Sequence, residues 1–478
     1  MKKVIGLVIL FTILLLFVSC SGIRTVYVIS ELETPDLHLE KLIDPTATYA
    51  ILVQDAFGDT IMSYNADKLL IPASTLKLVT AAVAWKFLGP EYRIPTYIGY
   101  DGFTNNNILF GNLVVTGTGD PTLDSRHWRN PEEIFTSWAD SLKAHGIREI
   151  RGDIIGNDDL FEETRLGSGW AWDDLSFSYA AEFGPLMADN TTVEFFINPP
   201  EEDDADISIM DNLPFDYFSY ENTVTFADSL PEHIHARRVI GENILSVYGN
   251  YSEDKKSYTK MITAENPTLF YASLLKATLE KAGILISGNA VDIDDTNEKP
   301  EEIIPLFTHF SPNLSLIIRQ FLQDSNNQAG EALLRHIGWH ETGYGSFNNG
   351  YMVLEVFFSN VNISWNEYRV TDACGLSRYN LFTPAAMNRI LLYMDDIPEF
   401  RDCLTSPGIN GTLVKRTALF DLDLIAKTGS MSGIDCISGY LKTARGKDLI
   451  FTVMINNYQP VKGQAHPVDS FIRLFNHF

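Results

Sequence analysis

The chain has 478 residues, enough for roughly two or three domains. Its 45 % hydrophobic and 12 % aromatic residues exclude a disordered protein, because a chain of this composition can bury a core. Acidic residues outnumber basic ones by 62 to 36, so the formal net charge of −26 argues against a nucleic acid or an anionic membrane surface as partner.

The first 19 residues are typical of an export signal. Lys2 and Lys3 precede the apolar stretch Val4–Val18, which is shorter than the ~20 residues of a membrane-spanning helix. The stretch ends in Phe17-Val18-Ser19-Cys20, which resembles the lipobox of bacterial lipoproteins. We therefore predict cleavage before Cys20, lipidation of that cysteine, and a periplasmic protein anchored to the membrane. An ordinary signal peptide with an incidental cysteine is the alternative.

A hairpin and a helix are predicted next. Tyr49–Ala56 and Thr60–Tyr64 are β-prone runs on either side of the turn-forming Phe57-Gly58-Asp59. Thr75–Leu88 is an apolar run of helix-forming residues that stops at Gly89-Pro90, a common helix ending.

From about residue 95 to 265 the chain favours short strands separated by turns. These runs are Asn107–Thr116, Glu149–Gly156, Thr192–Ile197, Thr223–Ala227 and Arg238–Tyr248. A helix is predicted at 267–283, and the acidic stretch 292–302 is the best linker candidate. Further helices are predicted near 312–338 and 384–396, then strands at 433–443 and 448–456 and a short terminal helix. This order indicates a host domain interrupted by an insertion.

A Ser-x-x-Lys pattern places a hydroxyl and an amine one helical turn apart, where the lysine can take the serine proton. Four copies occur: Ser74–Lys77, Ser252–Lys255, Ser257–Lys260 and Ser273–Lys276. Only Ser74 stands at a predicted helix N-terminus, where free N–H groups and the helix dipole favour developing negative charge. A simple helix cap is the alternative role for Ser74.

Two further motifs follow in the second half of the chain. Ser325-Asn326-Asn327 opens a helix-like run. Lys427-Thr428-Gly429 follows a β-prone run and precedes a predicted pair of strands. The ammonium group of the lysine, the hydroxyl of the threonine and the backbone N–H groups beside the glycine could therefore bind a carboxylate at a strand edge. An exposed turn is the alternative for the latter.

These three motifs in this order resemble the active-site set of the penicillin-recognising serine enzymes. The sequence around them resembles the D-alanyl-D-alanine carboxypeptidases of the penicillin-binding-protein-4 type, peptidase family S13. The motifs that carry this resemblance are Ile71-Pro72-Ala73-Ser74-Thr75-Leu76-Lys77, Gly117-Thr118-Gly119-Asp120-Pro121-Thr122-Leu123, Asp372-Ala373-Cys374-Gly375-Leu376-Ser377-Arg378 and Gly411-Thr412-Leu413.

The resemblance implies an α/β (α+β) fold, in which a penicillin-binding transpeptidase-like domain of antiparallel sheet flanked by helices is interrupted by a large β-rich insertion. The implied parts are a signal peptide at 1–19, the peptidase domain at 20–94 and 293–478, and the insertion at 95–292. The implied activity is serine D-Ala-D-Ala carboxypeptidase, with D,D-endopeptidase as a further option, on peptidoglycan stem peptides, with β-lactams as covalent inhibitors.

The resemblance also assigns roles to residues. Ser74, Lys77, Ser325 and Asn327 would be catalytic, and Ser74 and Ser430 would supply the oxyanion-hole N–H groups. Lys427, Thr428 and Gly429 would hold the terminal carboxylate of the substrate. Asp174, Tyr179 and Arg378 would contact a diaminopimelyl side chain.

The sequence departs from the family pattern at two places. Asn326 replaces the aspartate of a Ser-Asp-Asn motif, and Cys374 replaces the serine of Asp-Gly-Ser-Gly-Leu-Ser-Arg, where it also follows Ala373 in place of a glycine. We expect both to be plain substitutions, with oxidation at Cys374 as the alternative. Cys374, Cys403 and Cys436 either form one disulfide and one free thiol or stay buried and unpaired.

Other functions are less well supported by the sequence. We predict no cofactor, because Gly117-Thr118-Gly119 lacks the third glycine of a dinucleotide loop, and no metal, because His340-Glu341 continues without a zincin histidine. A serine β-lactamase-like hydrolase and a non-catalytic cell-wall-binding lipoprotein on the same fold are the remaining alternatives.

Overall fold

The computed structural model describes residues 45–199, 207–226, 233–251, 256–296, 298–459 and 466–478, all within the unit Leu42–Phe478. The predicted signal segment 1–19, Cys20 and the Ser252–Lys255 pair lie outside the described residues. Within the described ranges no helix is both long enough and apolar enough to cross a bilayer.

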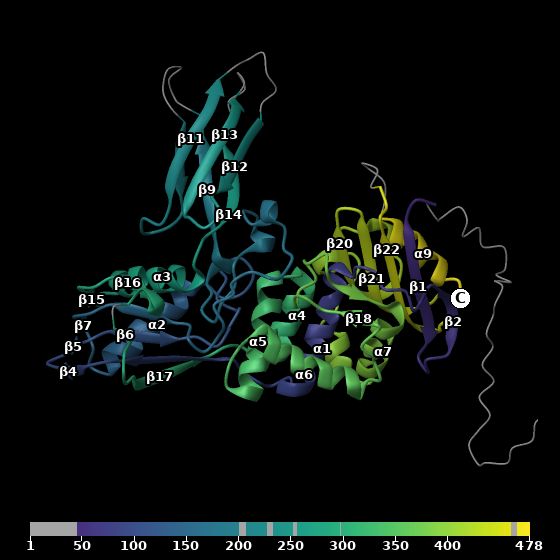
Figure 1. Cartoon of the computed structure of the whole chain (residues 1–478), viewed down its shortest axis with the longest axis horizontal. Coiled ribbons are helices and arrows are strands. Elements are labelled where there is room, and N and C mark those ends of the chain that lie inside the picture. The colour runs from purple at the N-terminus through teal and green to yellow at the C-terminus, as the bar shows by residue number, and fades with distance from the viewer. Residues whose placement is uncertain (1–44, 200–206, 227–232, 252–255, 297, 460–465) are drawn as a thin grey trace, which may run out of the picture. The chain divides into compact units, whose positions relative to one another are not determined.

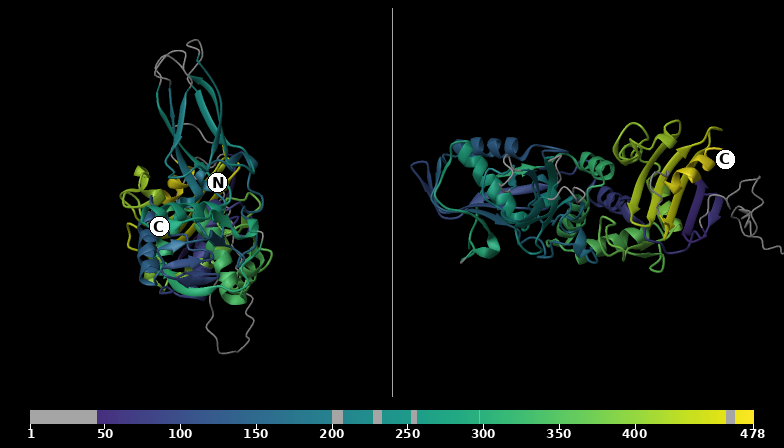
Figure 2. Two further views of the ribbon diagram at one scale, coloured as in Figure 1. Left: turned by 90° about the vertical axis from the view of Figure 1, so that its left-hand side faces the viewer. Right: turned by 90° about the horizontal axis from the view of Figure 1, so that it is seen from above.

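One antiparallel sheet of five strands, in the order β2-β1-β22-β21-β20, forms the centre of the host domain (Figure 1). Its strands are β1 (Thr48–Asp55), β2 (Thr60–Tyr64), β20 (Asp423–Met431), β21 (Ile434–Lys442) and β22 (Asp448–Asn456). β1 pairs with β22 from Thr48 opposite Asn456 to Asp55 opposite Leu449. The purple strands near the start of the described chain therefore lie beside the yellow ones near its end (Figure 2). The predicted hairpin and C-terminal strands are confirmed.

Helices cover both faces of this sheet. Ile450 and Met454 on β22 belong to the buried cluster formed with helical residues between 76 and 85, 314 and 361, and 386 and 394. Phe451 points to the other face, because successive strand residues alternate, and its ring lies 6.0 Å from that of Phe475 in the terminal helix. The helical elements of the host domain are η2 (Ala73–Leu76), α1 (Lys77–Leu88), α4 (Leu314–Asp324), α5 (Asn327–Thr342), α6 (Phe347–Asn360), α7 (Pro384–Met394), α8 (Pro398–Arg401), η7 (Gly411–Leu413), η8 (Thr417–Leu419) and α9 (Pro467–Phe475), with the short strands β18 (Tyr368–Arg369) and β19 (Leu381–Phe382).

The first part of the insertion is a mixed α/β unit. Its sheets have the orders β16-β8-β6-β3-β17 and β15-β7-β5-β4, and its helices are packed in one buried cluster with them. The elements are β3 (Pro95–Tyr100), β4 (Phe103–Asn105), β5 (Ile108–Phe110), β6 (Leu113–Thr116), α2 (Pro131–Ala144), β7 (Glu149–Ile150), β8 (Ile154–Asn157), α3 (Pro267–Lys281), β15 (Leu285–Ile286), β16 (Ala290–Asp292), η6 (Ile293–Asp295) and β17 (Ile304–Phe310). The expectation of strands and turns throughout 95–265 missed α2, although Asn130 and Pro131 give it a normal start.

The second part of the insertion consists of two three-stranded sheets, β10-β9-β14 and β11-β13-β12, around their own buried cluster. The elements are η3 (Trp172–Asp174), η4 (Ser178–Ala180), η5 (Asp189–Thr191), β9 (Thr192–Asn198), β10 (Ser208–Asp211), β11 (Ser219–Phe226), β12 (His233–Arg238), β13 (Ile244–Tyr251) and β14 (Tyr258–Thr263).

The C-terminal limit of the insertion can be drawn from strand pairing. β17 follows the predicted boundary at 292, yet it pairs antiparallel with β3, with Thr308 opposite Tyr97. A strand that completes a sheet of the insertion belongs to it. We therefore propose that the insertion ends after Phe310 and that the host domain resumes at α4.

Candidate active site

Ser74 and Lys77 meet where the 3-10 turn η2 runs into α1. Lys77 Nζ donates a hydrogen bond of 3.0 Å to Ser74 Oγ. The Ser74 side chain is half-buried and the Lys77 side chain is fully buried. The sequence predicted an α-helix starting at Thr75, whereas Ser74 lies within a 3-10 turn that precedes the α-helix. The short i to i+3 spacing still places both groups on one side of the turn.

Two more oxygen atoms surround the Lys77 amine. Lys77 Nζ donates to Asn327 Oδ1 at 2.5 Å and to the Cys374 carbonyl oxygen at 2.6 Å. Burial lowers the pKa of Lys77, and the nearby acidic side chains of Asp372 and Glu331 oppose that shift. A lysine with a lowered pKa is more easily neutral, which is the form that can accept a proton from a serine.

The motif at 325–327 forms the junction between α4 and α5. Ser325 ends α4 with a φ of 58°, and its hydroxyl accepts a 3.0 Å hydrogen bond from Lys427 Nζ. Asn326, which replaces the expected aspartate, caps α5 by accepting from the Ala329 N–H at 2.9 Å. An aspartate could make this same cap, so the substitution keeps the local structure.

The Lys427-Thr428-Gly429 motif lies on the edge strand β20. Lys427 is fully buried, and burial together with Lys77 holds its pKa well below the ordinary range. Thr428 Oγ1 donates to Thr412 Oγ1 at 2.7 Å, so the Gly411-Thr412-Leu413 motif supports this strand.

Gly429 and Gly375 allow backbone segments to approach Ser74 and Ala73 closely. A Cβ at Gly429 would lie 2.8 Å from the Ser74 amide nitrogen, closer than real Cβ atoms come. A Cβ at Gly375, whose φ is +85°, would lie 2.0 Å from the Ala73 carbonyl oxygen. Neither position can accept a larger residue without moving the turn that holds Ser74.

A cavity of about 430 Å³ joins these groups. Its lining residues are Ser74, Asp174, Tyr179, Ser325, Asn327, Gly375, Leu376, Arg378, Ser430, Met431 and Ser432. The structure therefore brings the predicted nucleophile, Ser430 and the three predicted side-chain contacts to one cavity. Lys77, Lys427 and Thr428 are not among the lining residues, but Lys77 contacts Ser74 and Lys427 contacts Ser325, and both serines line the cavity.

The insertion supplies one wall of this cavity. Asn327 Nδ2 donates to the Tyr179 carbonyl oxygen at 2.7 Å, and the Tyr179 hydroxyl donates to Asp174 Oδ1 at 2.7 Å. Burial and the neighbouring Asp174 raise the pKa of Tyr179, which keeps that hydroxyl protonated. On the host side, Arg378 Nη2 donates to the Ser432 carbonyl oxygen at 3.0 Å.

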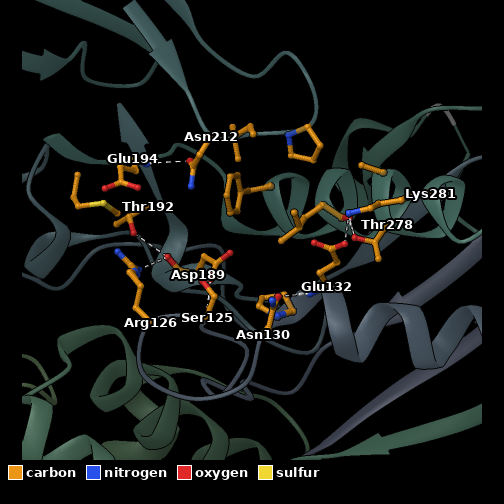
Figure 3. Close-up of a pocket in the computed structure, with 17 residues that line it drawn as sticks. Ser125, Arg126, Asn130, Glu132, Asp189, Thr192, Glu194, Asn212, Thr278 and Lys281 are labelled. Atoms are coloured by element: carbon orange, nitrogen blue, oxygen red, sulfur yellow. Dashed lines mark hydrogen bonds and ion pairs between the residues drawn. The ribbon is translucent and has the colours of Figure 1, made fainter. Parts of the chain in front are cut away.

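A larger cavity of about 580 Å³ lies within the insertion, between α2, α3 and strand β9 (Figure 3). Its polar groups are largely paired with each other: Lys281 with Glu132, and Ser125 with Asp189 at 2.6 Å. The smaller cavity is the better catalytic candidate, because it holds a hydroxyl and an amine in direct contact.

Sequence reasoning missed Glu331, one helical turn after Asn327 on α5. Its Oε1 accepts from the N–H groups of Ala373 and Cys374 at 2.7 and 3.1 Å. Burial and Asp372 raise the pKa of Glu331 to about 7. Glu331 thus fixes the segment whose Cys374 carbonyl binds Lys77. The i to i+4 spacing from Asn327 was the available signal, since it puts both side chains on one helix face.

The three described cysteines are all buried and free, so neither a disulfide nor a surface thiol is present among them. Burial, with Asp372 and Glu331 nearby, raises the pKa of Cys374 well above its ordinary value. The reactive thiolate is therefore disfavoured, which supports a plain substitution at this position.

Comparisons with known proteins show the family to which the chain belongs. The model of a family described as "D-Ala-D-Ala carboxypeptidase 3 (S13) family" matches residues 36–471. A D-alanyl-D-alanine carboxypeptidase of Actinomadura sp. (strain R39) is 27 % identical over 426 residues, covering 85 % of this chain and 77 % of that protein. D-alanyl-D-alanine carboxypeptidase DacB of Haemophilus influenzae is 27 % identical over 410 residues, covering 83 % of each.

The fold matches as well. The crystal structure of penicillin binding protein 4 (dacB) from Haemophilus influenzae superposes with a TM-score of 0.81 at 25 % identity, covering 92 % of this chain and 98 % of the other. This likeness extends over the host domain and the insertion together, and it confirms the predicted fold class.

Proposed function

Because the chain belongs to the D-Ala-D-Ala carboxypeptidase 3 (S13) family and is a serine-type D-alanyl-D-alanine carboxypeptidase, we propose that Ser74 is its nucleophile and Lys77 the base that activates it. The observation that carries this assignment is the 3.0 Å contact between Lys77 Nζ and Ser74 Oγ, together with the burial that lowers the lysine pKa. A neutral lysine can take the hydroxyl proton as the serine oxygen attacks.

Acylation then proceeds on the carbonyl between two D-alanines. The bond from Ser74 Oγ to that carbon forms, and the bond to the terminal D-alanine nitrogen breaks. The N–H groups of Ser74 and Ser430 would stabilise the oxyanion, because the close approach at Gly429 brings β20 against the nucleophile turn. The proton passes from Lys77 by way of Ser325 to the leaving amine, and water afterwards hydrolyses the acyl-enzyme.

The terminal carboxylate of the substrate would bind beside Lys427 and Thr428. Lys427 is held within hydrogen-bonding distance of Ser325, which lines the cavity. Its lowered pKa makes it sensitive to an incoming negative charge, so a carboxylate would favour the protonated form and a charge-assisted hydrogen bond. Asn327 would hold the peptide backbone while its side-chain oxygen keeps Lys77 in place.

The natural substrates would be the stem peptides of peptidoglycan, and β-lactams would acylate Ser74 as mimics of them. A second structure of the Haemophilus influenzae protein, complexed with a novel β-lactam, supports the latter by analogy of fold. Asp174 and Arg378 line the same cavity, and an acid and a base there would suit the amine and the carboxylate of a diaminopimelyl side chain.

This function is tested by the products formed. We expect release of D-alanine from a diaminopimelate pentapeptide, read by mass spectrometry, with only slow turnover of nitrocefin. Cross-linked muropeptide dimers in the same assay distinguish a carboxypeptidase from an enzyme that is also an endopeptidase. Rapid nitrocefin turnover without D-alanine release would instead indicate a β-lactamase.

Asp174→Asn is expected to slow hydrolysis of a diaminopimelyl peptide about ten- to a hundred-fold, because it removes one charge-assisted contact. A peptide with an apolar residue at that position should be little affected, and penicillin acylation nearly unchanged. Asp173→Asn is the matched control, since Asp173 is exposed and does not line the cavity. Equal losses on both peptides, with a lower Tm, would make Asp174 a structural residue.

We also propose that the protein is exported and anchored by a lipid on Cys20. The short apolar run ending in small residues supports this. The mass of the mature N-terminus would show a lipid-modified cysteine, and an unmodified N-terminus elsewhere would leave the protein secreted without an anchor.

A further inference from the structure

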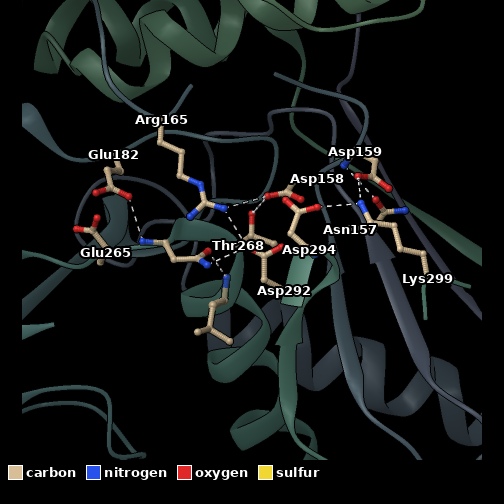
Figure 4. Close-up of polar contacts among 12 residues, drawn as sticks. Asn157, Asp158, Asp159, Arg165, Glu182, Glu265, Thr268, Asp292, Asp294 and Lys299 are labelled. Atoms are coloured by element: carbon tan, nitrogen blue, oxygen red, sulfur yellow. Dashed lines mark hydrogen bonds and ion pairs between the residues drawn. The ribbon is translucent and has the colours of Figure 1, made fainter. Parts of the chain in front are cut away.

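Five carboxylates gather at one end of the insertion's larger sheet. Figure 4 shows Asp158, Asp159, Asp292 and Asp294 among them. β8 and β16 run parallel, with Asp292 opposite Gly156, so the segments that follow both strands emerge at the same edge. The carboxylates are Asp158, Asp159 and Glu163 after β8, and Asp292 and Asp294 at the end of β16.

Two cations compensate this cluster only in part. Arg165 Nη2 lies 2.9 Å from Asp292 Oδ2 and 3.7 Å from Asp158 Oδ2. Lys299 Nζ lies 2.7 Å from Asp159 Oδ1 and 2.8 Å from Asp294 Oδ1. If all five acids are ionised, two cations leave three negative charges. In each of Asp158, Asp159 and Asp294, one of the two carboxylate oxygens takes no part in these ion pairs.

The burial of Asp158 indicates separately that a ligand binds at this cluster. It is 5 % exposed, and its Oδ2 already accepts a 2.7 Å hydrogen bond from Thr268 Oγ1. Its Oδ1 is fully buried and has no hydrogen-bond donor among the described residues. Figure 4 shows Asp158 and Asp294 side by side between Arg165 and Lys299. A buried carboxylate oxygen without a donor needs a cation or a proton close by.

The ligand atoms of the cluster suit a hard divalent cation. Ligand oxygens of Asp158, Asp159 and Glu163 all lie within 4.8 Å of one another, which is close enough for one ion to contact all three. Calcium accepts several carboxylate oxygens in a flexible geometry at about 2.3–2.6 Å, whereas magnesium needs a near-ideal octahedron and keeps several waters. We therefore expect calcium at this group of carboxylates.

The group of carboxylates is accessible from solvent. Asp159 and Glu163 are exposed, so an ion can reach them and the buried Asp158 next to them.

We propose that Asp158, Asp159 and Glu163 bind a calcium ion that braces the segment linking β8 to the catalytic cavity. Within this segment, next to the ligand Glu163, Glu162 Oε1 accepts hydrogen bonds of 2.8 Å from Arg335 Nε and from the Phe347 N–H. The same segment continues to Trp170, whose Nε1 donates to Asp372 Oδ2 at 3.0 Å, and then to Asp174. The ion would hold the first residues of the segment that runs from β8 to Asp174, and it would take no part in the reaction.

The test measures calcium binding by the whole protein after treatment with EDTA. CaCl₂ should give saturable one-site binding in isothermal titration calorimetry and raise the Tm, because a ligand that binds only the folded state stabilises it. MgCl₂ should bind more weakly. Glu163→Gln and Asp159→Asn should each weaken calcium binding at least about tenfold and reduce the Tm rise.

Both substituted residues are exposed, and each change removes a like charge from the cluster, so the variants should fold without calcium. Glu133→Gln, on the exposed face of α2, is the control and should bind calcium like the unaltered protein. The proposal is wrong if the unaltered protein shows no saturable binding in millimolar CaCl₂, or if both cluster variants keep the full affinity.

Discussion

Ser74→Ala is expected to abolish both covalent labelling by penicillin and release of D-alanine. The hydroxyl of Ser74 contacts the buried Lys77 at 3.0 Å and lines the 430 Å³ cavity. Ser325 lines the same cavity, but its hydroxyl contacts Lys427, for which we propose the role of binding the substrate carboxylate. Loss of the nucleophile removes the acyl-enzyme itself, so the residual rate should be at background rather than merely reduced. Intact-protein mass spectrometry after incubation with penicillin G measures the adduct directly.

Ser273→Ala is the matched control for that experiment. Ser273 also precedes a lysine by three residues, but Lys276 is paired with Glu280 at 2.9 Å on the surface of α3. Ser257→Ala and Ser252→Ala complete the set of Ser-x-x-Lys copies. All three should label like the unaltered protein. An adduct mapped to any serine other than Ser74 would overturn the assignment.

Lys77→Met should lower the acylation rate by about a hundred- to ten-thousand-fold, the usual contribution of a general base. The methionine keeps much of the buried volume but cannot accept the proton of Ser74 or bind the Cys374 carbonyl. The loss should be similar for a peptide ending in free D-alanine and for one ending in an amide, because the base acts on the nucleophile. Stopped-flow acylation kinetics with both peptides measure it.

Lys427→Met distinguishes the role of Lys427 from that of Lys77. It should slow hydrolysis of the free-carboxylate peptide far more than that of the amide, because its proposed partner is the substrate carboxylate. Both variants should be compared by thermal unfolding, since each buried lysine has several hydrogen-bond partners. Equal sensitivity of the two variants to the terminal carboxylate would contradict the assigned division of roles.

The chemistry of the site was accessible from sequence because it depends on local spacing. Ser74 and Lys77 are three residues apart, and a single turn of backbone brings their side chains together. The same holds for Lys427, Thr428 and Gly429 on one strand. The hairpin at 49–64 and the helix ending at Gly89 were likewise predictable, since turn residues and apolar periodicity act over a few positions.

Other features depended on contacts between distant segments. The pairing of β17 with β3, and so the later end proposed for the insertion, joins residues more than 200 positions apart. Helix α2 was missed because its neighbourhood is rich in strands, and its apolar face is satisfied only by packing on α3 and the sheet.

The sequence by itself determined the family, the three motifs and the order of the host-domain elements. Only the tertiary structure decided that Asn327 and the Cys374 carbonyl hold Lys77, that Glu331 fixes the latter segment, and that Asp158 keeps a carboxylate oxygen buried without a donor. The physical reason is the distance along the chain over which each interaction acts. Turn geometry and side-chain periodicity are set by neighbours along the chain, whereas desolvation and charge pairing depend on segments that meet only after folding.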